Sequence, residues 1–360
     1  MPERRRIVEL WRTGSGQVLV TLVRAEGSSY RRPGARLLLG AAGKYAGTIS
    51  GGCLETEVTR KANWIVRGGA AVERYSTLFD DTAEIPYGLG CGGTVDLLFE
   101  PVTTREAEAL LGALEGSLGG REAIVRTWLP GEGKELRRLV ESAAGEVLFR
   151  SAGLSDGDLA GEDGVYWERL DAPQRLVLIG AGDDARPVAA MAALLGWDVE
   201  VVDGRAQLAR VERFPGARTV RVVEDFGTLA LGERDAVVLM THSYEQDRAA
   251  LASLLTRPRM RYVGILGARH RTALLVAEAS VMVGTTVAET CGRIHAPIGL
   301  DLGGDGPEAI ALAIVAEVQA SCQGKLPASR RLTAEDVAAQ IEQGGASRYL
   351  AAQCALDTVL

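Results

Sequence analysis

The clearest pattern of apolar and polar positions runs from residue 175 to residue 204. A short apolar run at 176–179 ends in a glycine turn, 180–182. Apolar residues then recur every three or four positions over 188–195, the spacing of one buried helix face. A valine-rich strand follows and ends at Asp203. The order strand, glycine turn, helix, strand and acid predicts the βαβ unit of a dinucleotide-binding fold.

Four positions of this unit have a specific physical use. Gly180 permits the tight turn, and Gly182 lets the backbone approach a pyrophosphate. Ala185 takes the third glycine position, where a small residue lets helix and strand pack closely. Asp203 follows Gly180 by 23 residues, near the roughly 20 expected for an acid that binds a ribose hydroxyl. A nucleotide, NAD(P) or another, is therefore expected at Gly180, Gly182 and Asp203.

Two acids at the start of the helix oppose such a ligand. Asp183 and Asp184 stand where a phosphate would bind, and they complement the helix dipole themselves. The pattern thus predicts the fold more firmly than the ligand, and any nucleotide binding is expected to be weak.

The remaining pattern predicts an α/β chain of two domains and a tail. The first domain, 1–170, is expected to be α+β with a small mixed sheet. The second, 171–325, continues the βαβ alternation and is expected to form a Rossmann-like, doubly wound parallel sheet. Its last core helix opens with Asp305 as a capping acid. Residues 326–360 form the tail, with one amphipathic helix at 334–343. Further expected strands are 18–23, 36–39, 44–50, 72–75, 94–99, 123–129, 218–223, 236–241 and 262–266, with helices at 4–12, 54–67, 105–114 and 246–255 and a hairpin at 136–149.

Composition narrows the class of protein. The chain has 360 residues, ample for real cores, and its net charge of −7 argues against a nucleic-acid partner. The N-terminus lacks the apolar core of a signal peptide, and no apolar run is long enough for a membrane span, so a cytoplasmic location is expected. The five cysteines are scattered without a CxxC pair, which indicates neither a disulfide framework nor an iron–sulfur site.

Two cysteines in glycine turns are the candidates for chemistry. Cys53 follows Gly51 and Gly52 immediately before a predicted helix, where backbone amides bind anions and the dipole lowers a thiol pKa. Cys91 lies between Gly90 and Gly92, so that backbone can approach a ligand closely. The alternative is that both are small buried residues, as free cysteines often are.

Basic residues stand near the first of these turns. Arg31 and Arg32 lie on the preceding loop, and arginine suits phosphate recognition. Among the histidines, His242 follows a predicted strand at the edge where α/β sheets bind ligands. A polar loop histidine explains that position equally well.

Several longer phrases together resemble the XdhC/CoxI family, the xanthine dehydrogenase accessory factors. They are EGSSYRRPGARLLL (26–39), ISGGCLE (49–55), GLGCGGTVDLL (88–98), LIGAGDDARPVA (178–189), THSYEQD (241–247), YVGILGAR (262–269) and IHAPIGLDLGGDGPEAIALAIVAEVQA (294–320). Residues 101–170 lie outside the recognisable pattern.

The resemblance implies an accessory protein that binds the molybdenum–pterin cofactor, as molybdopterin or its dinucleotide form. It implies help with sulfuration of the cofactor and with its insertion into a molybdenum hydroxylase of the xanthine dehydrogenase type. The implied partners are the apo-hydroxylase and a cysteine desulfurase; we also expect a homodimer, and no nucleic acid or membrane partner. The segments around Cys53 and Cys91 are those to which a cofactor role transfers. We therefore expect a cofactor chaperone rather than an enzyme.

The rival hypothesis is an NAD(P)-dependent oxidoreductase. It would bind NAD through Gly180, Gly182 and Asp203, with His242 or His295 handling the proton. A complete xanthine dehydrogenase is excluded, because the chain lacks cysteine clusters for iron–sulfur centres and is too short.

Overall fold

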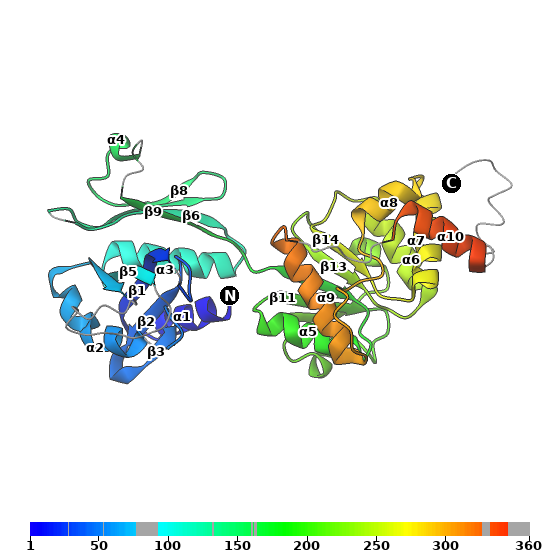
Figure 1. Ribbon diagram of the computed structural model, residues 1–360, viewed down its shortest axis with the longest axis horizontal. Helices are drawn as coiled ribbons and strands as arrows, with labels where there is room; N and C mark the ends of the chain where they lie inside the picture. The colour runs from blue at the N-terminus through cyan, green and yellow to red at the C-terminus, as the bar shows by residue number, and fades with distance from the viewer. Residues whose placement is uncertain are drawn as a thin grey trace. The chain divides into compact units, whose positions relative to one another are not determined.

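The computed structural model describes residues 1–27, 29–52, 54–76, 93–131, 133–159, 161, 164–325 and 332–344. The chain forms two compact units, Met1–Pro173 and Gln174–Leu360 (Figure 1). Each has its own sheets and its own apolar core.

The first unit is built on a five-stranded antiparallel sheet in the order β3-β2-β1-β5-β4. A second, four-stranded sheet in the order β8-β7-β6-β9 is also antiparallel. The α+β class is confirmed, with antiparallel pairing throughout both sheets where a mixed sheet was expected. The strands are β1 (Gly16–Gly27), β2 (Arg36–Gly40), β3 (Tyr45–Gly47), β4 (Ala71–Ser76), β5 (Gly93–Pro101), β6 (Ala123–Trp128), β7 (Arg137–Ser142), β8 (Val147–Arg150) and β9 (Val165–Leu170).

Helices cover both faces of the five-stranded sheet. Helix α2 (Glu55–Ile65) packs on one face through Val58 and Ala62. Helices α1 (Pro2–Arg12) and α3 (Arg105–Leu118) pack on the other face, and α3 also contacts the four-stranded sheet. Helix α3 therefore lies between the two sheets (Figure 1). A single turn, α4 (Asp156–Leu159), stands beyond the hairpin of β7 and β8.

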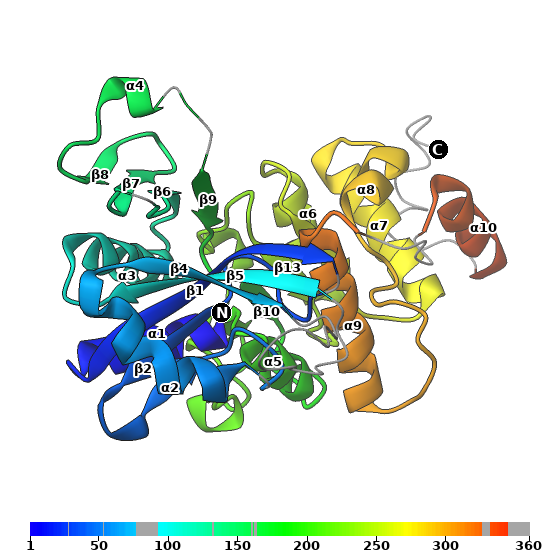
Figure 2. The same cartoon turned by 60° about the vertical axis from the view of Figure 1, so that its left-hand side comes forward.

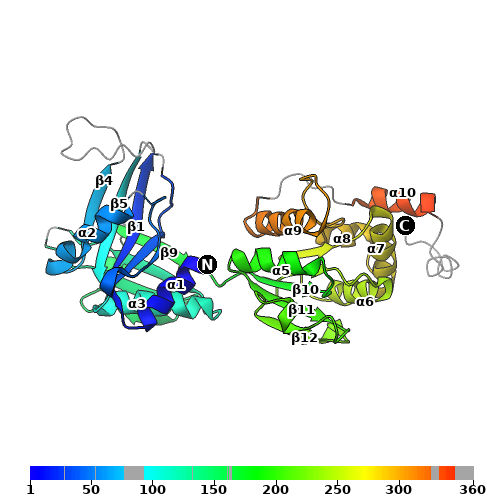
Figure 3. The same cartoon turned by 90° about the horizontal axis from the view of Figure 1, so that it is seen from below.

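The second unit is a Rossmann-like fold. Its parallel sheet has the order β12-β11-β10-β13-β14, so strand order reverses between β10 and β13. Figure 3 shows β10, β11 and β12 of this sheet. This confirms the predicted doubly wound sheet. The strands are β10 (Arg175–Ile179), β11 (Asp198–Asp203), β12 (Thr219–Val222), β13 (Ala236–Leu239) and β14 (Tyr262–Ile265).

Helices cover both faces of this sheet as well. On one face lie α5 (Ala185–Leu194) and α9 (Pro307–Cys322). On the other lie α6 (Tyr244–Leu255), α7 (Arg269–Val283) and α8 (Val287–Arg293). Helix α10 (Ala334–Gly344) lies beside α7 (Figure 2), and Val337 on it is buried in the same core.

Two local expectations were wrong. The capping role of Asp305 is absent, because Pro307 is the first helical residue and Gly306 takes the N-cap position without a side-chain cap. The strand expected at 44–50 covers only Tyr45–Gly47. Gly47 has a φ of +87°, and the chain then turns toward the start of α2.

Candidate functional site

A cavity of about 700 Å³ opens beside the start of α2 in the first unit. Three residues that the sequence singled out line it, namely Arg31, Gly51 and Gly52. Arg32 is exposed and is not part of the lining. The other predicted residues of this site lie outside the described part of the chain; they are Cys53, Gly90, Cys91 and Gly92.

The backbone amides near the start of α2 are bound by the chain itself. The Ser50 hydroxyl accepts from the amide of Gly52 at 3.2 Å and from that of Leu54 at 3.1 Å. The Glu55 carboxylate accepts from the amides of Ile49 at 3.1 Å and Ser50 at 2.8 Å. Burial raises the pKa of Glu55, but hydrogen bonds from Ser50 and Ile49 outweigh it and hold that pKa below its ordinary value. These four amides therefore already have acceptors within the chain, and an external anion would have to compete with Ser50 and Glu55 for them.

Arg31 also has a partner within the chain. Its guanidinium donates to both carboxylate oxygens of Glu3, at 3.0 and 2.5 Å, and both side chains are half-buried. The hydrogen bond to Glu3 raises the pKa of Arg31 above its ordinary value. An external phosphate would have to compete with Glu3 for this guanidinium.

In the second unit, Gly180 is fixed by the neighbouring strand. Its φ is +124°, and its amide donates to the Val202 carbonyl at 2.8 Å. A side chain at this position would place its Cβ 2.3 Å from the carbonyl oxygen of Met240, which follows β13. Gly180 therefore allows the turn to pack against β13. At Gly182 a Cβ would lie 2.7 Å from Oδ1 of Asp184.

Asp203 ends β11 with its side chain fully buried. Its Oδ2 accepts from the Ala181 amide at 2.8 Å and from the Arg205 guanidinium at 2.8 Å. Its Oδ1 accepts from the amide and the Nε of Arg205 at 2.8 and 2.9 Å. Burial raises the pKa of Asp203, but these hydrogen bonds outweigh it and lower the pKa overall. The acid predicted to bind a ribose hydroxyl holds the glycine turn and Arg205 in this structure.

The two acids after the glycine turn are paired as well. Asp183 accepts from Arg213 at 2.8 Å, and this hydrogen bond lowers the pKa of Asp183. His242 adopts a φ of +61° after β13, and its Nε2 lies 2.8 Å from Oδ2 of Asp184. Asp184 and His242 thus meet at the edge where strand order reverses, the usual ligand position in such sheets.

His295 lies elsewhere, in a buried network. Its Nδ1 is 3.3 Å from Glu317, and its ring stacks on that of Tyr262 at 4.3 Å. Tyr262 donates to Glu317 at 2.6 Å, and the Gly299 amide donates to the same carboxylate at 2.9 Å. His295 is only 5% exposed, so it is placed for packing and not for contact with a substrate.

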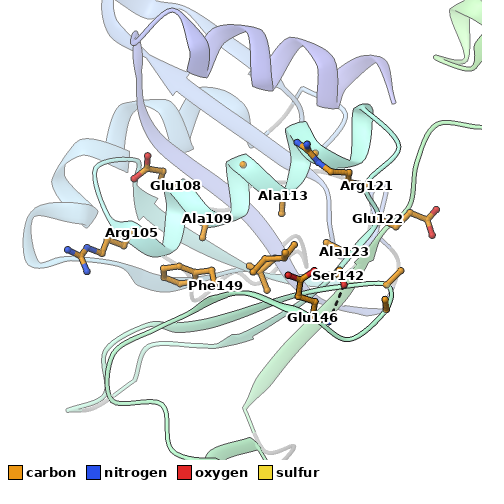
Figure 4. A pocket seen from close by; sticks show the side chains of 16 residues that line it. Arg105, Glu108, Ala109, Ala113, Arg121, Glu122, Ala123, Ser142, Glu146 and Phe149 are labelled. Carbon is orange, nitrogen blue, oxygen red and sulfur yellow. Dashed lines mark hydrogen bonds between the residues drawn. The ribbon is translucent and has the colours of Figure 1, made fainter.

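A larger cavity, of about 920 Å³, lies between α3 and the β7–β8 hairpin, away from every residue that the sequence singled out (Figure 4). Small residues on one face of α3 leave this space, at Ala109, Gly112, Ala113 and Gly116. Phe149 closes it from the hairpin side. The small-residue spacing on α3 is the signal in the sequence that indicates this hollow.

Across the described residues, no group of three or more metal-binding side chains comes together. The same part of the chain has no single helix that is long and apolar enough to span a membrane. One bent helix pair, α7 with α8, passes that test together by length and composition alone.

The fold and the sites define a class: an antiparallel α+β unit with a glycine-flanked cavity, joined to a Rossmann-like unit whose glycine turn is held by its own acids. The family described as the XdhC Rossmann domain matches residues 176–318, and the XdhC and CoxI family matches residues 10–76. The chain belongs to the XdhC and CoxI family.

Three relatives show how far this likeness extends. A Bacillus subtilis (strain 168) protein, named as a probable xanthine dehydrogenase subunit, is 27% identical, over 84% of this chain and 92% of its own. The molybdenum cofactor insertion chaperone PaoD of Escherichia coli (strain K12) is 27% identical, over 86% of this chain and 85% of its own. A crystal structure described as a xanthine dehydrogenase from Bacillus halodurans superposes with a TM-score of 0.77 at 26% identity, covering 90% of this chain and 97% of that chain.

Proposed function

We propose that this protein binds the molybdenum–pterin cofactor and assists its sulfuration and its insertion into a molybdenum hydroxylase of the xanthine dehydrogenase type. Family membership and the relative named as a molybdenum cofactor insertion chaperone support a role in molybdenum cofactor maturation. The observation that carries the proposal is the cavity beside α2. Arg31, Gly51 and Gly52 line this cavity, and Cys53 is the next residue in the sequence after Gly52.

Each end of the cofactor has a proposed contact. Arg32, exposed and next to Arg31 in sequence, meets the phosphate, while Arg31 lines the cavity in its ion pair with Glu3. Cys53 and Cys91 supply soft thiolates for the metal and sulfur end. The chain itself carries out no purine oxidation; the apo-hydroxylase receives the cofactor, and a cysteine desulfurase supplies the sulfur. A homodimer remains part of this proposal.

The test measures cofactor retention and delivery. The protein is purified from a molybdenum-replete host, gel-filtered and analysed for pterin content, and the same sample is used to reconstitute an apo-hydroxylase. The Cys53→Ser, Cys91→Ser double variant should lose most of the retained cofactor and the activation. Cys322→Ser, on α9, is the control and should behave as wild type. Full retention and activation in the double variant would remove the thiol role, and a wild-type protein without any cofactor would overturn the proposed function.

The oxidoreductase alternative fits the described geometry less well. The parallel sheet and glycine turn favour a nucleotide in general. However, both oxygens of Asp203 are already bonded to the Ala181 amide and to Arg205. His295, one of its two proton-handling residues, is buried beside Glu317.

A further inference from the structure

Two exposed tyrosines line the cavity beside α2. Tyr30 is 73% exposed and Tyr45 is 67% exposed, and both rings border the same space as Gly51 and Gly52. Tyr30 lies on the loop before β2, and Tyr45 is the first residue of β3. Large aromatic side chains at this exposure leave ring surface open to a ligand, and here that surface borders a hollow.

The ring of Tyr30 lies next to the position that a side chain of Gly51 would occupy. A Cβ added to Gly51 would come within 3.7 Å of ring atom Cδ1 of Tyr30, which is ordinary contact distance. The ring of Tyr30 and the backbone at Gly51 therefore form neighbouring walls without an intervening side chain. A cavity with such walls favours a planar ligand over a bulky, non-planar one.

The polar groups of the cavity point to the same kind of ligand. Ser50 and Glu55 are occupied by hydrogen bonds within the turn. The remaining charged groups, Arg31 and Glu3, form a half-exposed ion pair with one donor and one acceptor side. A planar ring whose edge carries both N–H donors and oxygen or nitrogen acceptors can bond to both members of this pair. A bare anion, in contrast, is repelled by the Glu3 carboxylate.

We infer that Tyr30 and Tyr45 hold the planar pterin ring of the cofactor by stacking, with the ring edge toward Arg31 and Glu3. Aromatic side chains bind heteroaromatic rings in this way with little dependence on the identity of the ring. The volume of about 700 Å³ lies within the range of small-molecule sites. This inference rests on the proposed function, and it assigns the ring end of the cofactor to side chains that the sequence patterns did not single out.

A nucleobase offers the same stacking chemistry, because the dinucleotide form of the cofactor carries one. The pterin is favoured, since both forms of the cofactor contain it. The two sources are distinguished by separate probes: neopterin, a fluorescent pterin without phosphate, and the mononucleotides GMP and CMP.

The experiment titrates the full chain, freed of cofactor, with neopterin and follows quenching of pterin fluorescence. Tyr30→Ala and Tyr45→Ala should each weaken binding about tenfold, within the range for loss of one stacked ring. Tyr30→Phe and Tyr45→Phe should stay within about threefold of wild type, because the ring face is retained. Trp64→Ala is the matched control, as Trp64 is 67% exposed on α2 but does not line the cavity. Unchanged thermal unfolding of each variant excludes misfolding.

The outcomes separate this inference from the proposed function. Equal neopterin affinity in wild type and both alanine variants, or binding of GMP or CMP without neopterin, overturns the stacking site. If those variants also retain the full cofactor from the host, the proposed function stands and only the stacking site fails. If the wild type retains no cofactor from the host, the proposed function fails by itself.

Discussion

At the scale of the residue, two charged side chains that the sequence offers for a ligand have partners within the chain. Asp203 is bonded to Ala181 and Arg205, and Arg31 is bonded to Glu3. A buried carboxylate needs such partners because its desolvation is costly. The same reasoning applies to the fully buried pair of Arg138 and Glu100, whose atoms lie 2.8 Å apart between α3 and the sheets.

Asp203 should therefore matter for stability. Asp203→Asn should lower the free energy of unfolding by about 2 kcal/mol, because Arg205 loses a charged acceptor. Since the folded pKa lies below the ordinary 3.8, this contribution is present above pH 3.8 and disappears as pH falls through the folded pKa. Urea titrations at several pH values should show the difference between wild type and variant shrinking in acid. Asp183→Asn is the control: its side chain is 83% exposed, so the change in its free energy of unfolding should be far smaller than that of Asp203→Asn.

Nucleotide binding should be weak for the same reason. The Asp203 carboxylate would have to leave Arg205 to meet a ribose, and Asp183 and Asp184 place negative charge near a phosphate. Calorimetry with NAD, NADP and ATP should give dissociation constants well above the micromolar range. Tight NADP binding would contradict this prediction most strongly, because Asp203 should repel a 2′-phosphate.

At the scale of the element, strands and helices form where local patterns predict them, and their close contacts depend on distant residues. The turn after β10 is the clearest case, because Gly180 has a left-handed φ and its backbone approaches Met240, sixty residues further along the chain. A glycine there serves packing between two strands, whether or not a pyrophosphate binds.

Replacing Gly180 should damage the second unit. Gly180→Ala is expected to lower the free energy of unfolding by about 3 kcal/mol or more, from the strained φ and the 2.3 Å approach of Cβ to the Met240 carbonyl. Gly204→Ala serves as the nearby control. Its Cβ would meet Gln246 at 3.6 Å, so a loss of no more than about 1 kcal/mol is expected. Chemical denaturation followed by circular dichroism measures both, and equal stability of the two variants would contradict the packing argument.

Helix α10 lies beyond the stretch that matches the XdhC Rossmann domain, yet its apolar face joins the core of the second unit. Val337→Ala should cost on the order of 2 kcal/mol, because its side chain is fully buried among apolar neighbours. Glu335→Ala, an exposed change on the same helix, should stay within about 0.5 kcal/mol. The midpoints of thermal unfolding test this, and a silent Val337→Ala variant would show that the helix does not stabilise the unit.

At the scale of the whole molecule, the two units carry different kinds of site. The first has a cavity that is lined by two exposed tyrosine rings and by glycine backbone. The second has a glycine turn whose three acids each have a partner within the chain: Asp203 with the Ala181 amide, Asp183 with Arg213 and Asp184 with His242. The proposed function therefore places cofactor handling in the first unit.

This assignment predicts that changes in the second unit spare cofactor retention. Asp203→Ala should retain the cofactor at a level close to wild type when assayed at a temperature where it stays folded. The Cys53→Ser, Cys91→Ser double variant should retain little under the same conditions. Pterin content after gel filtration measures both. Loss of cofactor from a folded Asp203→Ala protein would assign a direct cofactor role to the second unit.

Much of the fold could be predicted from local patterns. Helical spacing over 188–195 and the short apolar runs on either side are sufficient for β10, α5 and β11, because periodicity records which face is buried. The same holds for the hairpin of β7 and β8 and for α10. The family resemblance is confirmed for the same reason: its motifs are short, local phrases that keep their order along the chain.

The sequence by itself therefore determined many of the elements, the Rossmann-like alternation and the family. Only the tertiary structure decided which polar side chains already have hydrogen-bond partners. Those partners lie far away along the chain or at the opposite end of a turn. Glu3, on α1, accepts a hydrogen bond from Arg31. His242, after the end of β13, contacts Asp184. Tyr45, on β3, lines the same cavity as Gly51. Periodicity records the burial of a residue but not the identity of its neighbour, so the cavities and the rings beside them become visible only once the chain is folded.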